Sequence, residues 1–141
     1  MQKRKKYLKS KGSHHILHES GSVAYSGQFY ALAQHYISKD YIKAVLKNAK
    51  LSLDEFIGIV PISIDSYKRK TEFKPPVTEK VLEIQEVYQN GLNTFGESFY
   101  SWMDTTNVAL GNVKPKELLV NSFGVRLLLD EIGRMEHGIL S

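Results

Sequence analysis

Apolar and polar residues follow a helical period along most of this chain. From residue 28 onward, apolar side chains recur at steps of three and four, which is the spacing of one helix face. The first such stretch breaks near Ser38-Lys39-Asp40, because Ser and Asp favour helix caps over helix interiors. The sequence contains no internal repeat and no convincing alternation of period two. The pattern therefore predicts an all-α fold.

Residues 52–70 hold the sharpest local pattern. Ser52 and Glu55 form a capping-box sequence, in which each side chain satisfies a free backbone N–H at a helix start. Pro61 cannot continue that helix, because it lacks an N–H and clashes with the preceding turn. Ser63 is then placed to cap a second short helix. Two helices joined by a tight turn within about 20 residues are typical of a helix-turn-helix unit.

A longer helix is predicted after Pro75-Pro76. It is expected to continue through Gly91 and Gly96, which weaken a helix without breaking its pattern. The far end of its apolar face is expected to form core between two modules rather than a platform for stacking nucleic-acid bases. The three aromatic residues at that end are Phe95, Phe99 and Trp102.

The last helix is predicted to begin at Asn121 or Ser122 and to end at Gly138, where a left-handed residue commonly terminates a helix. Gly124 lies in its first turn, where the missing Cβ permits a close approach of another helix. The residues expected to face inward from this helix are Phe123, Leu127, Leu128, Ile132 and Met135.

Charge divides the 141-residue chain unevenly, although its net value is only +4. Residues 1–12 contain six basic residues and no acidic one, which leaves 13 basic against 15 acidic residues in the remainder. Residues 95–141 contain four basic and six acidic residues, a net charge of −2. Too few apolar residues occur before residue 28 to bury, so residues 1–27 are predicted to be a flexible basic arm.

The absence of cysteine excludes several kinds of site. It excludes disulfides, thiolate zinc sites, iron–sulfur clusters and a cysteine nucleophile, and it is compatible with the cytoplasm, which is the predicted location. His14, His15 and His18 lack a fourth ligand and a scaffold, so we predict neither a metal nor a cofactor. Glu136-His137 lacks a third catalytic group, so we do not predict an enzyme. No apolar run is long enough to span a membrane.

The C-terminal third resembles the toxin-binding domain of the Xre/MbcA/ParS antitoxins. The closing run GRMEHGI, residues 133–139, carries the most specific part of the resemblance. The preceding segments SLDEFIGIVPISIDSYKRK and EKVLEIQEVYQNGLNTFG are similar to the family's Xre-type helix-turn-helix module. The other matching positions are Trp102, Asn107, Leu110, Gly111, Pro115, Leu118, Leu119 and Gly124.

The resemblance implies an organisation and a partner. Residues 28–94 would be the helix-turn-helix module, and residues 95–141 the toxin-binding domain. The partner implied is a RES-domain toxin that consumes NAD, and the complex would repress its own operon. The C-terminal tail would block the entrance to the toxin's NAD site. The residues to which this role falls are Arg134, Glu136, His137, Gly138, Ile139, Leu140 and Ser141.

The second short helix supplies the candidates for contact with operator DNA. They are Ser63, Asp65, Ser66, Lys68, Arg69 and Lys70. Arg69 could read a guanine bidentately, and Lys68 and Lys70 could hold phosphates. A homo-oligomer is expected, because two such helices on a two-fold operator bind more tightly than one. The alternative is that this surface is merely the solvated face of a structural helical pair.

A second function stays open on the sequence alone. The chain could be a stand-alone Xre-like transcriptional regulator, in which the C-terminal domain serves only for dimerisation. The neighbouring reading frame discriminates between the two, because a RES-domain gene beside this one would favour the antitoxin. The basic arm could contact DNA in either case, or be a solvated tail.

Overall fold

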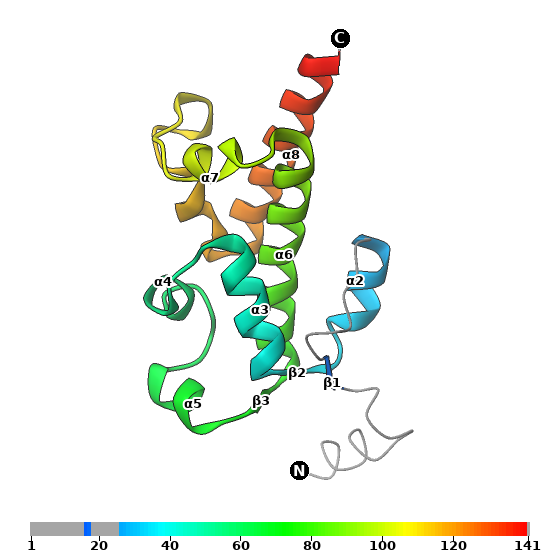
Figure 1. Cartoon of the computed structure of the whole chain (residues 1–141), viewed down its shortest axis with the longest axis vertical. Coiled ribbons are helices and arrows are strands. Elements are labelled where there is room, and N and C mark those ends of the chain that lie inside the picture. Colours follow the sequence, from blue (N-terminus) through cyan, green and yellow to red (C-terminus); the bar gives the residue numbers. More distant parts are fainter. Residues whose placement is uncertain (1–15, 18–25, 141) are drawn as a thin grey trace.

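Helices make up most of the part of the chain that the computed structural model describes, residues 16–17 and 26–140 (Figure 1). Within these residues, no helix combines the length and the apolar character that crossing a bilayer would require. Most of the predicted arm, residues 1–15 and 18–25, lies outside the described residues. In chain order the elements are β1 (Ile16–Leu17), α2 (Ser26–Leu32), β2 (Tyr36–Ser38), α3 (Lys39–Ala49), α4 (Leu53–Ile57), α5 (Ile64–Arg69), β3 (Glu72–Phe73), α6 (Pro75–Phe95), α7 (Ser98–Met103), the 3₁₀ helices η2 (Val108–Leu110) and η3 (Pro115–Val120), and α8 (Ser122–Leu140).

A small sheet of three strands corrects the all-α prediction. β1 pairs in parallel with β2, and β2 pairs antiparallel with β3. Ile37 lies in register with Leu17 on one side and Phe73 on the other, and all three side chains are buried. Each strand has only two or three residues, which is too short for an alternation to be recognised in the sequence. The helical character is confirmed, and the fold is mostly helical rather than all-α.

Side-chain caps start three helices where the sequence predicted them. Ser38, Ser52 and Ser63 each accept a hydrogen bond from the backbone N–H three residues on, at 3.1 Å. The Ser52 N–H in turn donates to the Glu55 carboxylate at 2.9 Å, which completes the capping box. These caps depend on contacts between residues close in sequence, which is why the sequence located them.

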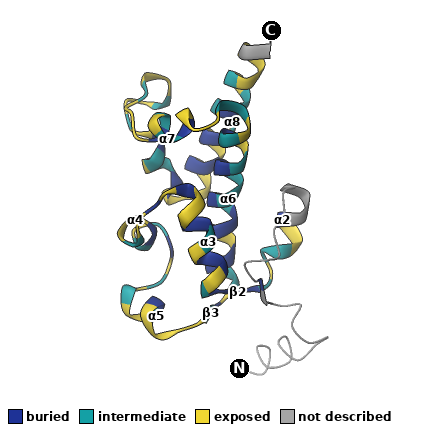
Figure 2. Cartoon of the chain, viewed as in Figure 1, coloured by how far each residue is buried: buried dark blue, intermediate teal, exposed yellow. Residues whose placement is uncertain are grey.

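Helix α6 forms the centre of the molecule. α3 packs on one side of it and α8 on another, and the buried residues gather where these helices meet (Figure 2). Thr78, at the start of α6, is fully buried and donates its hydroxyl to the His35 carbonyl at 2.6 Å. The Tyr41 hydroxyl donates to Gln85 Oε1 at 2.6 Å and joins α3 to α6. Polar groups of α6 thus fix the elements that precede it.

The helix predicted to run on to Trp102 ends instead at Phe95, so the expectation that Gly96 would not break it is wrong. Gly96 has a φ of 64°, a left-handed value that glycine adopts without strain, and α7 begins two residues later. The turn carries Phe99 back over α6, where it meets Gly91. A Cβ on Gly91 would lie 2.2 Å from the Phe99 ring, so this close approach requires a glycine.

Phe99 is the centre of an aromatic cluster between α6 and α7. Its ring stacks on Phe95 at 6.4 Å and on Trp102 at 5.5 Å between centroids, and it meets Tyr88 edge-on at 5.5 Å. Phe99 is fully buried, and Phe95 and Trp102 are half-buried against the core. The prediction that this row belongs to the core is confirmed.

A buried lysine and a glycine hold η3 in place. Lys80 is 8% exposed, and its Nζ donates to the Leu119 carbonyl at 3.0 Å and pairs with Glu83 at 2.7 Å. A Cβ on Gly124 would lie 2.0 Å from the Leu118 carbonyl oxygen. The close approach predicted for Gly124 is therefore confirmed, although its neighbour is the 3₁₀ helix η3.

Candidate functional site

The outer face of α8 carries exposed apolar side chains. Phe123 is 74% exposed, Leu127 is 52% exposed, and Val120, just before the helix, is 52% exposed. We call these three residues the outer apolar patch. The opposite face of α8 packs on the core through Val125, Leu128 and Ile132.

The prediction that Phe123 and Leu127 face inward is wrong. A helix turns once in 3.6 residues, so these two side chains project on the side opposite to Leu128 and Ile132. Apolar residues therefore occupy two opposite sides of α8, and only one side can face the core. This two-sided pattern was present in the sequence, and it is typical of a helix that also meets a partner.

The last turns of α8 project beyond the rest of the molecule (Figure 1). Of the residues predicted for the tail, Arg134, Glu136, His137 and Gly138 are all exposed. Arg134 pairs with Glu131 of its own helix at 2.5 Å, and this hydrogen bond raises the pKa of its guanidinium. The Nδ1 atom of His137 lies 2.8 Å from the carbonyl oxygen four residues earlier. The tail therefore presents polar side chains from a helix.

Gly138 does not end α8 as predicted, because the helix continues to Leu140. Its φ is not left-handed, and a Cβ there would meet nothing within 4 Å. Neither a turn nor packing requires a glycine here, and a glycine near a helix end costs less than one in the interior. Ile139 and Leu140 thus belong to the last turn of α8, and Ser141 lies outside the described residues.

The residues predicted to contact DNA lie on and beside α5. Ser63 is the N-cap of this helix, and its Oγ accepts from the Ser66 N–H, so both residues help to form the helix start. Ser66 is half-buried. The exposed members are Ser63, Asp65, Lys68, Arg69 and Lys70. The cations therefore gather at the C-terminal end of α5, where they also complement the negative end of its dipole.

One aromatic residue anchors α5 to the body. Tyr67 is 5% exposed, stacks on Phe73 with centroids 5.6 Å apart and meets Phe56 edge-on at 6.1 Å. Burial raises the pKa of the Tyr67 hydroxyl. A groove beside α5, between β3 and the start of α6, is lined in part by Arg69 and Lys70. Both side chains thus border a hollow next to a fixed helix.

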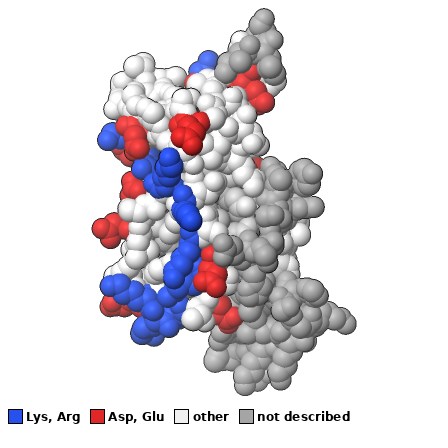
Figure 3. All heavy atoms as spheres, in the orientation of Figure 1, with Lys and Arg blue, Asp and Glu red and all other residues white. Residues whose placement is uncertain are grey.

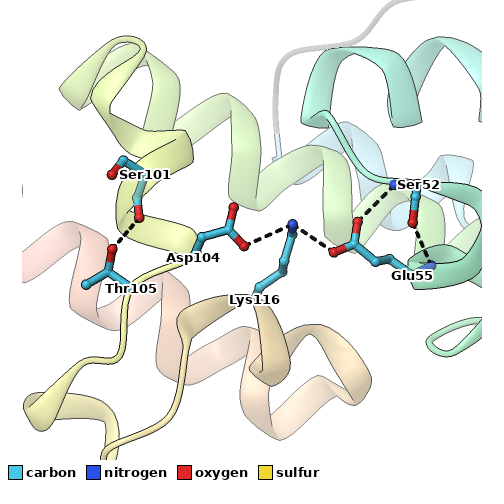
Figure 4. Close-up of polar contacts among 6 residues, drawn as sticks. All are labelled: Ser52, Glu55, Ser101, Asp104, Thr105 and Lys116. Atoms are coloured by element: carbon cyan, nitrogen blue, oxygen red, sulfur yellow. Dashed lines mark hydrogen bonds and ion pairs between the residues drawn. The ribbon is translucent and has the colours of Figure 1, made fainter.

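Lys116 links α4 to the C-terminal part of the chain (Figure 4). Its Nζ lies 2.8 Å from Glu55 and 3.1 Å from Asp104. The hydrogen bond from Lys116 lowers the pKa of Glu55, against a smaller opposing effect of burial. Burial alone would lower the pKa of Lys116, but its bonds to the two carboxylates together raise it. Glu55 therefore serves both the cap of α4 and this bridge.

The arrangement offers surfaces for binding. Among residues 16–17 and 26–140, no three His, Asp or Glu side chains gather as a metal site would require. His14, His15 and His18 lie outside the described residues. What the structure presents is an exposed apolar patch, a projecting helix end and a cationic helix end. The projecting end and α5 lie at opposite ends of the molecule (Figure 1).

Comparisons with known proteins point to a family. The family model described as "Antitoxin Xre/MbcA/ParS C-terminal toxin-binding domain" matches residues 92–138. The chain is also 32% identical over 111 residues to a protein named Antitoxin Xre from Yersinia enterocolitica serotype O:8 / biotype 1B (strain NCTC 13174 / 8081). That alignment covers 74% of this chain and 75% of the relative. The outer apolar patch and most of the projecting helix end fall inside the matched residues.

Proposed function

Because the chain belongs to the Xre/MbcA/ParS antitoxins, whose C-terminal domain binds a toxin, we propose that it has two roles. It would neutralise a RES-domain toxin, which consumes NAD, and it would also repress its own operon. It would act by binding, and no catalytic group is assigned to it. The choice of a RES toxin follows from the resemblance to this family, whose antitoxins are paired with such toxins; the closing run GRMEHGI carries the most specific part of that resemblance. The exposed outer face of α8 is the observation that carries the proposal.

The outer apolar patch supports docking of the toxin on α8. Phe123 and Leu127 are one helical turn apart and both are more than half exposed, although soluble proteins rarely expose neighbouring large apolar side chains without use. Burying each of them against a partner would contribute about 1–2 kcal/mol. Neither residue packs in the core, so the toxin could cover both without rearrangement of the antitoxin.

The projecting end of α8 supports a blocking role for the tail. Once the outer apolar patch is docked, the residues that follow it along the helix would reach past the contact and into the toxin. The residues proposed to block are those named from the sequence: Arg134, Glu136, His137, Gly138, Ile139, Leu140 and Ser141.

Repression is proposed to use α4 and α5 as a helix-turn-helix unit. Arg69 would contact base edges, while Lys68 and Lys70 would contact phosphates. Two copies of the chain would place two α5 helices on a two-fold operator, so a homo-oligomer is part of the proposal. The separation of α5 from the end of α8 along the molecule supports simultaneous binding of DNA and toxin.

Co-expression with the RES-domain protein encoded beside the chain tests the toxin role. The wild type should co-purify with the toxin and keep cellular NAD at its normal level. The truncation that removes residues 137–141 should still co-purify but should fail to protect NAD. Full protection of NAD by the truncated chain would refute the blocking role of the tail.

A pair of variants tests the docking surface. The variant Phe123→Ser/Leu127→Ser should lose capture of the toxin while its thermal unfolding stays close to the wild type. Val108→Ser is the matched control, because Val108 is 80% exposed in the same matched domain but lies in η2, outside the patch. If the wild type captures no RES-domain protein and the patch variant instead becomes monomeric, the chain is the stand-alone regulator.

A further inference from the structure

A row of lysines follows one side of α3. Lys39, Lys43, Lys47 and Lys50 recur at steps of four, four and three, so they share a helix face. With a rise of 1.5 Å per residue, the row is about 16 Å long. Lys43 and Lys47 are exposed, and neither forms an ion pair with a carboxylate of the described residues. Asp40 is the single carboxylate within α3.

The ends of the row are fixed by contacts with neighbouring elements. Lys39 Nζ donates to the Lys68 carbonyl at 3.2 Å and lies 4.8 Å from the centre of the Tyr67 ring. Lys50 Nζ lies 4.2 Å from the centre of the Tyr100 ring on α7. The first contact joins the row directly to the cationic end of α5. Lys43 and Lys47, between these ends, keep their ammonium groups toward solvent.

The row and the end of α5 form one band on the surface. Figure 3 shows Lys and Arg side chains running without interruption over α3 and down to α5 on a single face of the molecule. From the exposure and the contacts above, the members are Lys39, Lys43, Lys47, Lys50, Lys68, Arg69 and Lys70. We call this set the basic band. No described ion pair with an acidic residue neutralises any of its members.

We propose that the α3 part of the basic band holds the phosphate backbone of duplex DNA whose bases are contacted by α5. This inference rests on the DNA-binding role proposed above and extends the contact surface beyond the helix-turn-helix unit. It gives α3 a role in DNA binding beside that of α5. The contact would be independent of base sequence.

The chemistry of the row favours DNA over an acidic protein surface. An ammonium group is a point charge that suits phosphate, whereas the planar guanidinium of Arg is the group best shaped for bidentate contacts. The charges follow one another at intervals of about 4.5–6 Å along the helix, and a strand of DNA is a line of closely spaced negative charges. A partner that meets α5 and then continues for about 16 Å along α3 must also be extended.

Salt-dependent DNA binding of the full chain tests this inference. Fluorescence anisotropy would follow binding to a duplex from the region upstream of the chain's own reading frame and to a scrambled duplex of equal length. Lys43→Gln/Lys47→Gln removes two charges from exposed sites and keeps a good helix former at both. Lys114→Glu changes the net charge by the same amount at an exposed site outside the band and serves as the control.

The lysine variant should bind both duplexes about 30-fold more weakly than the wild type at 0.15 M salt, because two phosphate contacts are lost. The slope of log K against log salt should become shallower by about 1.8. The control should keep the wild-type slope. Because the row carries no base contact, the preference for the upstream duplex over the scrambled one should be unchanged in the lysine variant.

Three other outcomes separate this inference from the function on which it rests. A wild-type slope and affinity in the lysine variant, together with lost binding in Arg69→Ala/Lys70→Ala, would overturn the inference and leave the DNA-binding role standing. Absence of DNA binding by the wild type would overturn both. Unchanged DNA binding with lost toxin capture in the lysine variant would assign the row to an acidic protein surface and would also overturn the inference.

Discussion

Replacing Gly91 by alanine should destabilise the protein, although alanine is the better helix former. The new Cβ would lie 2.2–2.3 Å from three atoms of the Phe99 ring. Carbon atoms in contact normally lie about 3.5–4.0 Å apart, so the ring must move by more than 1 Å. Phe99 is fully buried among other rings and has no free space to enter. Overpacking of this kind costs about 3 kcal/mol, and the helix propensity of alanine returns about 1 kcal/mol. The net loss should be about 2 kcal/mol.

Urea unfolding monitored by Trp102 fluorescence would measure this loss. Trp102 is the single tryptophan of the chain, and its ring centroid lies 5.5 Å from that of Phe99. The midpoint should fall while the slope with urea stays constant, because the surface exposed on unfolding is unchanged. Gly133→Ala is the control, since a Cβ there meets nothing within 4 Å. That control should be more stable than the wild type by about 0.5–1 kcal/mol.

A double-mutant cycle identifies the cause. Phe99→Leu removes the ring atoms that the alanine would strike, so the cost of Gly91→Ala should shrink or change sign in that background. A coupling free energy of at least about 1 kcal/mol is expected for two residues in such contact. Equal costs of Gly91→Ala in the two backgrounds, or a stability of the single variant matching that of Gly133→Ala, would refute the reasoning.

Three further predictions concern the links between α6, η3 and α4. Lys80→Met should lower the free energy of unfolding by about 3 kcal/mol in thermal or urea unfolding, because the largely buried carboxylate of Glu83 loses its ion-pair partner. Lys80→Met/Glu83→Met should recover part of that loss, and a still lower stability of the double variant would contradict the explanation. Lys116→Met should lower the free energy of unfolding by about 0.5–1 kcal/mol at pH 7, because it removes the ion pair with Glu55. The loss is small because the Glu55 carboxylate is exposed and water screens the pair. The lowered pKa of Glu55 gives stability that is present above its unfolded pKa of about 4.3 and is lost as the pH falls through the lower pKa of the folded state. The raised pKa of Lys116 gives stability that is present below about pH 10.4 and is lost as the pH rises through the folded pKa. The free energies of unfolding of wild type and variant should therefore draw together as the pH falls below about 4, and a constant difference across acidic pH would exclude the bridge as its source. Gly124→Ala should lower the unfolding midpoint by an amount equivalent to about 2 kcal/mol, because the new Cβ would force η3 to move away from α8. An unchanged midpoint would show that η3 does not have to move.

Features that depend on neighbouring residues could be predicted from the sequence. The capping box of Ser52 and Glu55 and the cap at Ser63 need only a few consecutive residues, and both are present in the structure. The end of α6 could not be predicted in the same way. Gly96 can continue a helix or leave it, and packing of Phe99 on Gly91 favours the turn, a contact that no local pattern reveals.

In the candidate site, too, features set by local sequence could be predicted and features set by long-range contacts could not. Residues of α5 and the end of α8 could be named from motifs and from resemblance, and their roles stay predictions. Apolar spacing alone predicts burial for Phe123 and Leu127, so it does not reveal the outer apolar patch, in which both residues lie opposite the core residues of their own helix. The bridge through Lys116 joins residues 55 and 116, so only the folded chain brings its partners together.

The unbroken length of α6 has a consequence for the DNA that the oligomer would recognise. Its 21 residues span about 32 Å, and the half-sites of a two-fold operator lie about 34–36 Å apart on one face of a duplex. α3 packs against α6, as does α8, so neither helix is joined to α6 through a flexible linker alone. The proposed oligomer should therefore tolerate little change in the spacing of an operator's half-sites. Inserting half a helical turn between the half-sites should therefore abolish joint occupancy, while a full turn should restore it only if the oligomer itself can be extended.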